Sequence, residues 1–291
     1  MFQIISDGSC DFSPEEVRAH DIEIVPFYVT FDEQTYLKEG IDITKADYFN
    51  RLKNEKDLFP KTSQPSPQDY LDQYTPYLQA GKDLLVVTIS SKLSGSNNSA
   101  RIAMEMAKDE FPAANIYVVD SLSATIGQGL LVREVINMRE AGLSVSEAAT
   151  LALKIVPTIR LYFTLDTLEY LKRGGRISPA KALVGNMLGI KPILHLVEGE
   201  VAQFDKVRGN AKAIKLIEEK AVTDLQDQKT KVNISVGHIL SQEDAQQLKA
   251  SVEQLLGVSI TNPITDVGVT IGTHVGPGAL PIAYCISYKY L

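Results

Sequence analysis

The chain is predicted to be an α/β protein with two domains that hold a ligand between them. Its length of 291 residues suits one large domain or, as we expect, two domains that share a cleft. Strand and helix signals alternate through the first half, which predicts a parallel sheet covered on both faces. A hairpin signal in the second half predicts a mixed sheet there. We therefore expect an N-terminal domain at residues 1–157 and a C-terminal domain at residues 158–291.

The elements expected in the first half follow from short apolar runs and from helix start signals. Ser66 can cap a helix whose first turn contains Pro67, and Ser144 with Glu147 has the spacing of a capping box. The apolar runs, rich in Ile, Val, Leu and Phe, predict buried strands. The predicted strands are 22–31, 84–89 and 116–119, and the predicted helices after the first begin at 94, 125 and 144.

The second half is expected to open with strands and a hairpin. Lys191–Val197 and Val201–Val207 can pair across the turn at 198–200. A helix that starts near Leu168 should end at Lys172 and Arg173, with Gly174 as its left-handed cap. The other predicted strands are 160–165, 232–239 and 280–288, and the predicted helices are 209–228 and 241–256.

Composition excludes several classes of protein. The formal net charge of -7 and the lack of a basic stripe argue against a nucleic-acid binder. Two cysteines without CxxC spacing suit a reducing compartment, and the N-terminus lacks the features of a signal peptide. The most apolar stretch, 182–196, is interrupted by Lys191 and Pro192 and is too short to span a bilayer. We expect a soluble cytoplasmic protein.

Three polar loops, far apart in the chain, are predicted to converge on one anionic group. The second of them follows the apolar run 84–89, and ligands of open α/β sheets bind beyond the carboxyl ends of such strands. Hydroxyls and free backbone N–H groups can hold a carboxylate or phosphate there. The loops are Thr62–Ser66, Ser90–Ser96 and Gly272–Gly278.

Each loop also has a simpler interpretation. Thr62 can belong to a turn that precedes a helix, and Ser94 can be a helix N-cap. A capping serine nevertheless exposes backbone N–H groups at the positive end of the helix dipole, which suits an anion. His274 is expected in a glycine-rich loop of the kind that often approaches a ligand.

Motifs for nucleotides, metals and cofactors are missing. The chain contains neither GxxxxGK[ST] nor a GxGxxG between a strand and a helix. Its four histidines are scattered singly, without the spacing of a metal site. We expect no cofactor and no metal.

An alternative interpretation is an acyl ester or thioester hydrolase that uses Ser94 and His274. Ser94 precedes a glycine at a strand-loop-helix junction, but GxSxG is missing because position 92 is lysine. A triad also needs an orienting carboxylate, for which the candidates are Asp120 and Asp266. Turnover of acyl esters that disappears with Ser94→Ala would support this alternative.

The apolar segment 183–190 favours an anion with a long hydrocarbon tail, although it can equally be core. About sixteen buried methylenes would contribute on the order of 13 kcal/mol gross, at roughly 0.8 kcal/mol each. Charge-assisted hydrogen bonds to a carboxylate contribute only about 1.5–3 kcal/mol each. The tail would therefore supply affinity, and the hydroxyls would fix orientation.

Taken together, these motifs resemble the DegV family, which includes the fatty-acid-binding subunits of bacterial fatty acid kinase. Each motif is weak alone, and their order along nearly the whole chain is specific. The motifs are 6–11, 62–66, 90–96, 120–121, 173–177, 189–193 and 272–278.

The resemblance implies a fold, a ligand and a partner. It implies two α/β domains around a fatty acid whose carboxylate is held by Thr62, Ser94 and His274 and by the N–H of Gly95. The family's binders present this carboxylate to a separate ATP-dependent kinase, and the acyl phosphate enters phospholipid synthesis. The binder itself is not catalytic. Candidates for pocket or partner contacts are Ser63, Arg173, Arg176 and Arg208, the last nearest to the family's kinase-docking arginine; transient contact with a membrane surface is also expected.

Overall fold

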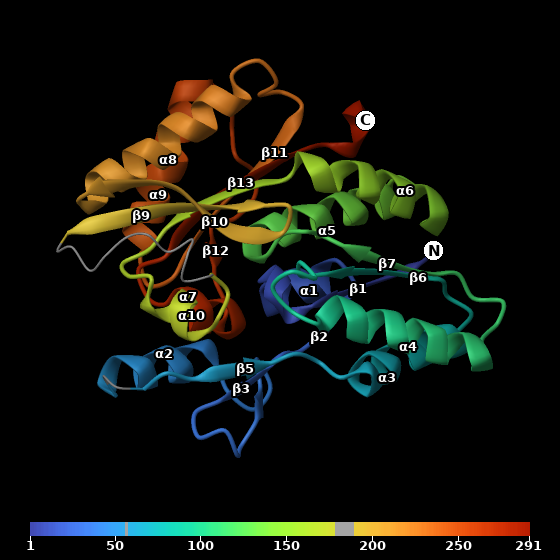
Figure 1. The fold of residues 1–291 in the computed structure, drawn as a ribbon. Helices are drawn as coiled ribbons and strands as arrows, with labels where there is room; N and C mark the ends of the chain where they lie inside the picture. Colours follow the sequence, from blue (N-terminus) through green and yellow to red (C-terminus); the bar gives the residue numbers. More distant parts are fainter. Residues whose placement is uncertain (56–57, 178–188) are drawn as a thin grey trace.

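The computed structural model describes residues 1–55, 58–177 and 189–291. Its N-terminal half is built around a four-stranded parallel sheet in the order β2-β1-β6-β7 (Figure 1). The strands are β1 (Gln3–Asp7), β2 (Ile22–Val25), β6 (Leu84–Thr88) and β7 (Ile116–Asp120). The parallel sheet predicted for the first half is confirmed.

Helices cover both faces of this sheet, because successive side chains of a strand point to opposite faces. Leu84 and Val86 of β6 pack in one cluster with α3 and α4, whereas Leu85 and Val87 pack in another with α5 and α6. The predicted capping serines are confirmed at the starts of α3 and α6. The helices are α3 (Pro67–Gln79), α4 (Ser96–Glu110), α5 (Thr125–Glu140) and α6 (Val145–Ile155).

A six-stranded mixed sheet forms the C-terminal half, in the order β10-β9-β8-β13-β11-β12. β11 and β12 pair in parallel, and the other neighbours pair antiparallel. The predicted hairpin is confirmed by β9 and β10, in which Glu200 lies opposite Val197. The strands are β8 (Arg160–Thr164), β9 (Ile190–Val197), β10 (Glu200–Arg208), β11 (Val232–His238), β12 (Thr265–Asp266) and β13 (Leu280–Ile286).

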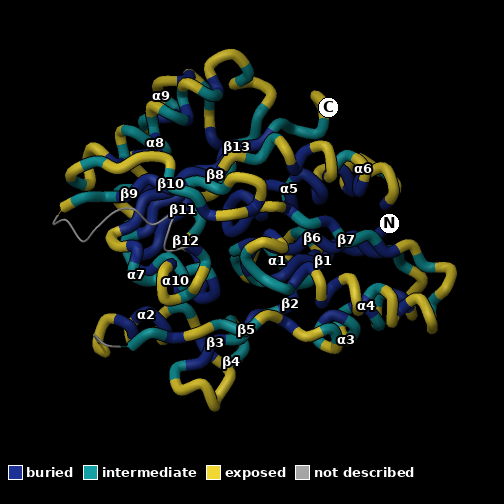
Figure 2. The backbone as a smooth tube through the Cα atoms, in the orientation of Figure 1, coloured by how far each residue is buried: buried dark blue, intermediate teal, exposed yellow. Residues whose placement is uncertain are grey.

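The middle layer of the molecule is formed by α5 and α6, which lie between the two sheets (Figure 1). α5 contacts β1 and β6 on one side and β11 and β13 on the other, so it is buried nearly all round, as Figure 2 shows. α8 (Asn210–Leu225) and α9 (Gln242–Leu256) cover the outer face of the mixed sheet. The boundary between residues 157 and 158 stays a prediction.

A small antiparallel sheet, β4-β3-β5, was not predicted for the first half. The single strand expected at 22–31 is wrong, because the chain forms two strands that belong to different sheets and are separated around Pro26. Proline has no N–H for a sheet ladder, so it favours such a break. The strands of this sheet are β3 (Tyr28–Thr30), β4 (Leu37–Lys38) and β5 (Lys61–Ser63). The helix α2 (Lys45–Asn54) lies between β4 and β5 in the chain.

The helix α10 (Val269–Val275) occupies part of the segment expected to be a glycine loop, so that expectation is wrong for residues 272–275. α10 comes from the C-terminal half, yet it contacts η1 (Gly8–Cys10), α2, β3 and β5 of the N-terminal half. In Figure 1, α10 lies beside α7 between the mixed sheet and α2. The remaining helical segments are α1 (Pro14–Ala19), α7 (Glu169–Arg173), η2 (Val156–Thr158) and η3 (Tyr288–Tyr290).

Two further expectations concern the region after α7. The left-handed residue is Gly175, with φ 71°, and the prediction of Gly174 is wrong, because Gly174 keeps a right-handed φ of -72°. Residues 183–188 of the apolar segment lie outside the described residues, so its predicted place along a tunnel stays a prediction. Within the described ranges, we find no helix with the length and apolar character needed to cross a membrane.

Candidate functional site

The first and third predicted loops meet at a hydrogen bond between Thr62 and His274. Thr62 lies in β5, opposite Val29, and its Oγ1 is 2.8 Å from Nε2 of His274 in the last turn of α10. These residues are 212 positions apart in the chain. The structure therefore brings together two of the residues that the sequence analysis selected.

The imidazole of His274 is neutral at physiological pH. Burial, and secondarily the positive charge of Arg176, lowers the pKa of His274 to about 4. Its Nδ1 is buried and has no hydrogen-bond partner among the described residues. A Cβ on Gly174 would lie 2.3 Å from that Nδ1, which explains why glycine is needed at this position.

The Thr62–His274 pair is suited to presenting a hydroxyl donor to an anion. A neutral imidazole has one N–H donor and one acceptor nitrogen. When Nε2 carries the hydrogen, it donates to Oγ1 of Thr62, and the threonine O–H is then available to donate elsewhere. An anion next to Thr62 would favour this arrangement, because its hydrogen bond with the hydroxyl is charge-assisted.

The second loop brings Ser94 and Gly95 to the same region. The N-cap of α4 is Gly95, so the interpretation of Ser94 as the N-cap is wrong, although its Oγ accepts a hydrogen bond of 3.2 Å from the N–H of Ser96. A Cβ on Gly95 would lie 2.2 Å from Oε1 of Gln64. Glycine at position 95 therefore permits the loop after β5 to close on the start of α4.

Two residues to which the sequence analysis gave no role hold these loops in place. Nε2 of Gln64 donates to Oγ of Ser99 in α4 over 3.1 Å. Asp7, fully buried at the end of β1, accepts hydrogen bonds from the N–H of Ile89 at 3.0 Å and from Oγ of Ser96 at 2.8 Å. β1 also contains Gln3 and Ser6, so a polar residue at its end is no distinctive signal for Asp7, and no local signal identifies Gln64.

The predicted arginines occupy three different positions. Arg176 lies beside the site, where its Nε donates to the carbonyl oxygen of Leu93 over 3.0 Å, and burial lowers its pKa. Arg173 lies further out, 3.6 Å above the ring centre of Phe59. Arg208 is exposed at the end of β10 and does not line the cavity described next.

A cavity of about 310 Å³ lies behind this polar group. Thr62, Ser63, Ser94, Arg176 and His274 all line it, and its walls are otherwise mainly apolar. The apolar walls come from both halves of the chain; they include Phe27, Ile89, Leu161, Phe163, Leu196 and Pro281. Its size falls within the range of small-molecule pockets, about 300–1,000 Å³. An amphiphilic molecule with a polar end and an apolar body fits this lining.

A second hollow, of about 380 Å³, is lined by some of the same polar residues. It shares Thr62, Arg176 and His274 with the cavity, and it is also lined by Lys61 and Arg173. The shared residues therefore line both the mainly apolar cavity and a hollow that contains basic side chains.

In the part of the chain that the structure describes, the hydrogen bonds that a hydrolase triad needs around His274 are missing. Nε2 of His274 is bonded to Thr62, and its Nδ1 has no carboxylate partner. Asp120 accepts from the backbone N–H groups of Ser91 and Leu122, and Asp266 pairs with Lys45. A histidine with a pKa of about 4 is also a weak base at neutral pH. Over the same described ranges, no cluster of His, Cys, Asp or Glu could hold a metal ion.

Comparison with known proteins relates nearly the whole chain to one family. Residues 1–287 match a family model described as uncharacterised proteins of the DegV family. The DegV domain-containing protein YteA of Lactococcus lactis is 37% identical over 290 residues, which cover 99% of this chain and 98% of that protein.

Solved structures have the same architecture. A stearic acid-binding protein from Eubacterium ventriosum superposes with a TM-score of 0.95 at 32% identity, covering 100% of both chains. The fatty acid binding protein DegV of Bacillus subtilis superposes with a TM-score of 0.84 at 28% identity, covering 98% of this chain and 99% of that one. The two-sheet arrangement described above is thus shared along the full length of these proteins.

Proposed function

Since the chain belongs to the DegV family, we propose that it binds a long-chain fatty acid in the cavity between its two halves. The observation that carries the proposal is the Thr62–His274 pair at the polar end of an otherwise apolar cavity. Fatty acid binding by two structurally similar proteins supports it. The ligand's carboxylate meets Thr62, Ser94 and the N–H of Gly95, with His274 orienting the threonine hydroxyl.

The free energies of the individual contacts indicate what the head group and the tail of the ligand each contribute to binding. Each buried methylene contributes roughly 0.8 kcal/mol, so a long tail supplies most of the affinity. Each hydrogen bond to the carboxylate contributes about 1.5–3 kcal/mol, less the cost of desolvating the ion. The neutral imidazole adds no further charge to a cavity wall that already contains Arg176, so the cost of desolvating a second charge is avoided.

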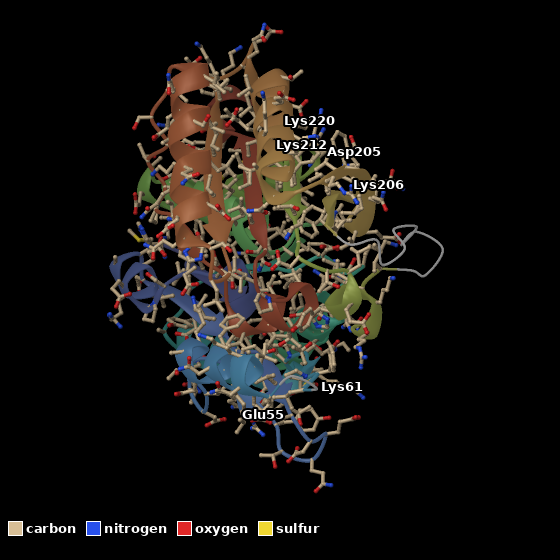
Figure 3. All side chains as sticks on the ribbon, turned by 90° about the vertical axis from the view of Figure 1, so that its left-hand side faces the viewer. Glu55, Lys61, Asp205, Lys206, Lys212 and Lys220 are labelled. Carbon is tan, nitrogen blue, oxygen red and sulfur yellow. The ribbon has the colours of Figure 1, made fainter. Side chains whose placement is uncertain are left out.

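The second part of the proposal concerns a partner. The protein presents the bound carboxylate to a separate ATP-dependent fatty acid kinase and is not itself catalytic; the acyl phosphate then enters phospholipid synthesis. The basic hollow outside Thr62 and His274 offers such a partner a route to the carboxylate. Arg208, the last residue of β10, contributes to the docking surface. Lys206 of the same strand and Lys212 of α8 also contribute; both are labelled in Figure 3. This role requires a cytoplasmic protein that exchanges its ligand at a membrane surface.

The experiment that tests the fatty acid proposal is direct. The protein is purified without added lipid and denatured, and its organic extract is analysed by mass spectrometry. We expect long-chain fatty acid in near-equimolar amount, and stripped protein should rebind added fatty acid. An extract without lipid, together with no rebinding, would show the proposal to be wrong.

A further inference from the structure

The start of α10 is held by two carboxylates from the other half of the chain. Glu39, which follows β4, accepts hydrogen bonds through Oε1 from the N–H of Val269 and through Oε2 from the N–H of Thr270, the latter at 3.0 Å. Oε2 also accepts from the hydroxyl of Thr270. Asp11 accepts from the N–H of Gly268 at 2.9 Å. The N–H groups that a helix leaves unpaired in its first turn thus find partners in distant elements.

The two carboxylates share one small space against the backbone of Gly268. A Cβ on Gly268 would lie 2.5 Å from Oε1 of Glu39 and 2.7 Å from Oδ1 of Asp11, so only glycine allows this approach. Lys45 is the nearby cation, and its amine also pairs with Asp266 of β12. Burial raises the pKa of both carboxyl groups.

This contact reaches the candidate site through α10 itself. Thr270 lies four residues before His274, so the two side chains share one face of the helix, and both line the cavity. α10 has only seven residues, and a helix this short depends on contacts outside itself. The hydrogen bonds that Val269 and Thr270 donate to Glu39 join the first turn of α10 to the half of the chain that carries Thr62.

We propose that Glu39, assisted by Asp11, is a positioning residue for the head-group site. It holds the first turn of α10 in place and thereby keeps the imidazole of His274 in contact with Thr62. It also keeps the two halves of the chain together around the cavity. The part of this inference that concerns affinity rests on the proposed function. The part that concerns His274 does not.

The test compares Glu39→Gln with Glu134→Gln. An amide cannot replace a carboxylate that accepts three hydrogen bonds through two oxygens, because one of its two terminal atoms is a donor. Glu134 is a matched control: it is fully buried in α5 and accepts from the N–H of Tyr288, but it does not touch α10. Both variants are measured without ligand and with fatty acid.

The first readout is the titration of the His274 imidazole, followed by nuclear magnetic resonance in lipid-free protein. We expect Glu39→Gln to loosen α10, admit water to the imidazole and move its pKa from about 4 toward the usual value of about 6.5. Glu134→Gln should leave the titration unchanged. An unaltered His274 titration in Glu39→Gln would overturn the proposal.

The second readout is affinity for fatty acid, which should fall at least tenfold in Glu39→Gln and less than twofold in Glu134→Gln. If wild-type protein binds no fatty acid, the proposed function fails, while the titration still decides the role of Glu39. If Glu39→Gln does not fold, Thr270→Val replaces it, since this change removes one of the hydrogen bonds to Glu39 with little change in shape. A His274 titration that is unaffected by Thr270→Val would then overturn the proposal.

Discussion

The hydrogen bond between Thr62 and His274 gives the site an oriented donor for an anion, in addition to the positive charge of Arg176 in the cavity wall. The imidazole is buried and neutral, so it orients the threonine hydroxyl and contributes no charge of its own. Arg176 lies near enough to lower the pKa of His274, and its Nε is already bonded to the backbone of Leu93. A donor that is oriented in advance loses little entropy when the ligand binds.

Loss of one head-group donor should weaken binding by a limited amount. We expect Thr62→Val or Ser94→Ala to reduce the free energy of fatty acid binding by about 1–3 kcal/mol, because a charged hydrogen bond is lost while the tail stays buried. Calorimetric titration measures this change. Thr75→Val is a control, since the hydroxyl of Thr75 bonds to Leu71 within α3, away from the cavity. Unchanged affinity in Ser94→Ala would contradict the assignment of Ser94.

Asp11 should make stability fall as the pH rises. Burial, and the negative charge of Glu39, raise its pKa to about 7, from a usual value near 3.8. Between these values the folded protein binds more protons than the unfolded chain, so the contribution of Asp11 to stability is present below about pH 4 and is lost by about pH 7. The nearby charged groups that oppose or reinforce this effect are Glu39 and Lys45.

Asp11→Asn isolates this contribution. Asparagine tolerates the left-handed φ of 55° at this position and keeps an acceptor for the N–H of Gly268. We expect the free energy of unfolding of the variant, relative to wild type, to rise between pH 4 and pH 7 in urea titrations. A difference between the two proteins that does not depend on pH would contradict the raised pKa.

Among the elements, the loop between β6 and α4 shows why glycine is required where two segments meet. Gly95 has ordinary right-handed dihedral angles, with φ -77° and ψ 6°, so its backbone would accept alanine. The requirement comes from the side-chain amide of Gln64, which would lie 2.2 Å from a Cβ at position 95. The constraint is therefore one of packing between the loop after β5 and the start of α4.

Loss of stability caused by a side chain at position 95 should be partly restored by shortening the side chain at position 64. Gly95→Ala should displace the amide of Gln64, break its hydrogen bond to Ser99 and lower the free energy of unfolding by about 1 kcal/mol. Adding Gln64→Ala removes the clash, so the double variant should be destabilised by less than the sum of the two single changes. Additive effects in denaturant titrations would show that Gly95 and Gln64 do not interact.

In the folded protein as a whole, the candidate site is formed by segments from both halves of the chain. β5 and the loop before α4 come from the first half, and α10 comes from the second, although α10 packs largely on first-half elements. The part of the proposed kinase surface to which Arg208 contributes is a different region, at the end of β10. Binding and docking should therefore be separable by mutation.

Arg208→Glu tests this separation. We expect phosphorylation of the bound fatty acid by the kinase to fall at least tenfold, because reversing a charge at a docking surface replaces attraction by repulsion. Affinity for fatty acid should stay within twofold, since Arg208 does not line the cavity. Lys108→Glu, on the exposed face of α4, is the matched control for a change of charge. Equal kinase activity in both variants would place the docking surface elsewhere.

Much of the fold could be read from local patterns. Apolar runs located β6 and β7, capping boxes located the starts of α3 and α6, and the turn at 198–200 located the hairpin of β9 and β10. These features depend on residues that are near one another in the chain, so periodicity and capping chemistry are enough to find them. The hydroxyls and the histidine of the candidate site were visible for the same reason, as polar residues at the ends of predicted elements.

Contacts between distant segments required the folded protein. The helical state of His274 and the need for Gly174 beside the imidazole arise where α10 meets β5 and α7. The pKa of His274 near 4 and the capping of α10 by Glu39 likewise depend on burial among residues far away in sequence. Desolvation and close packing are properties of the three-dimensional surroundings, so no local pattern in the chain encodes them.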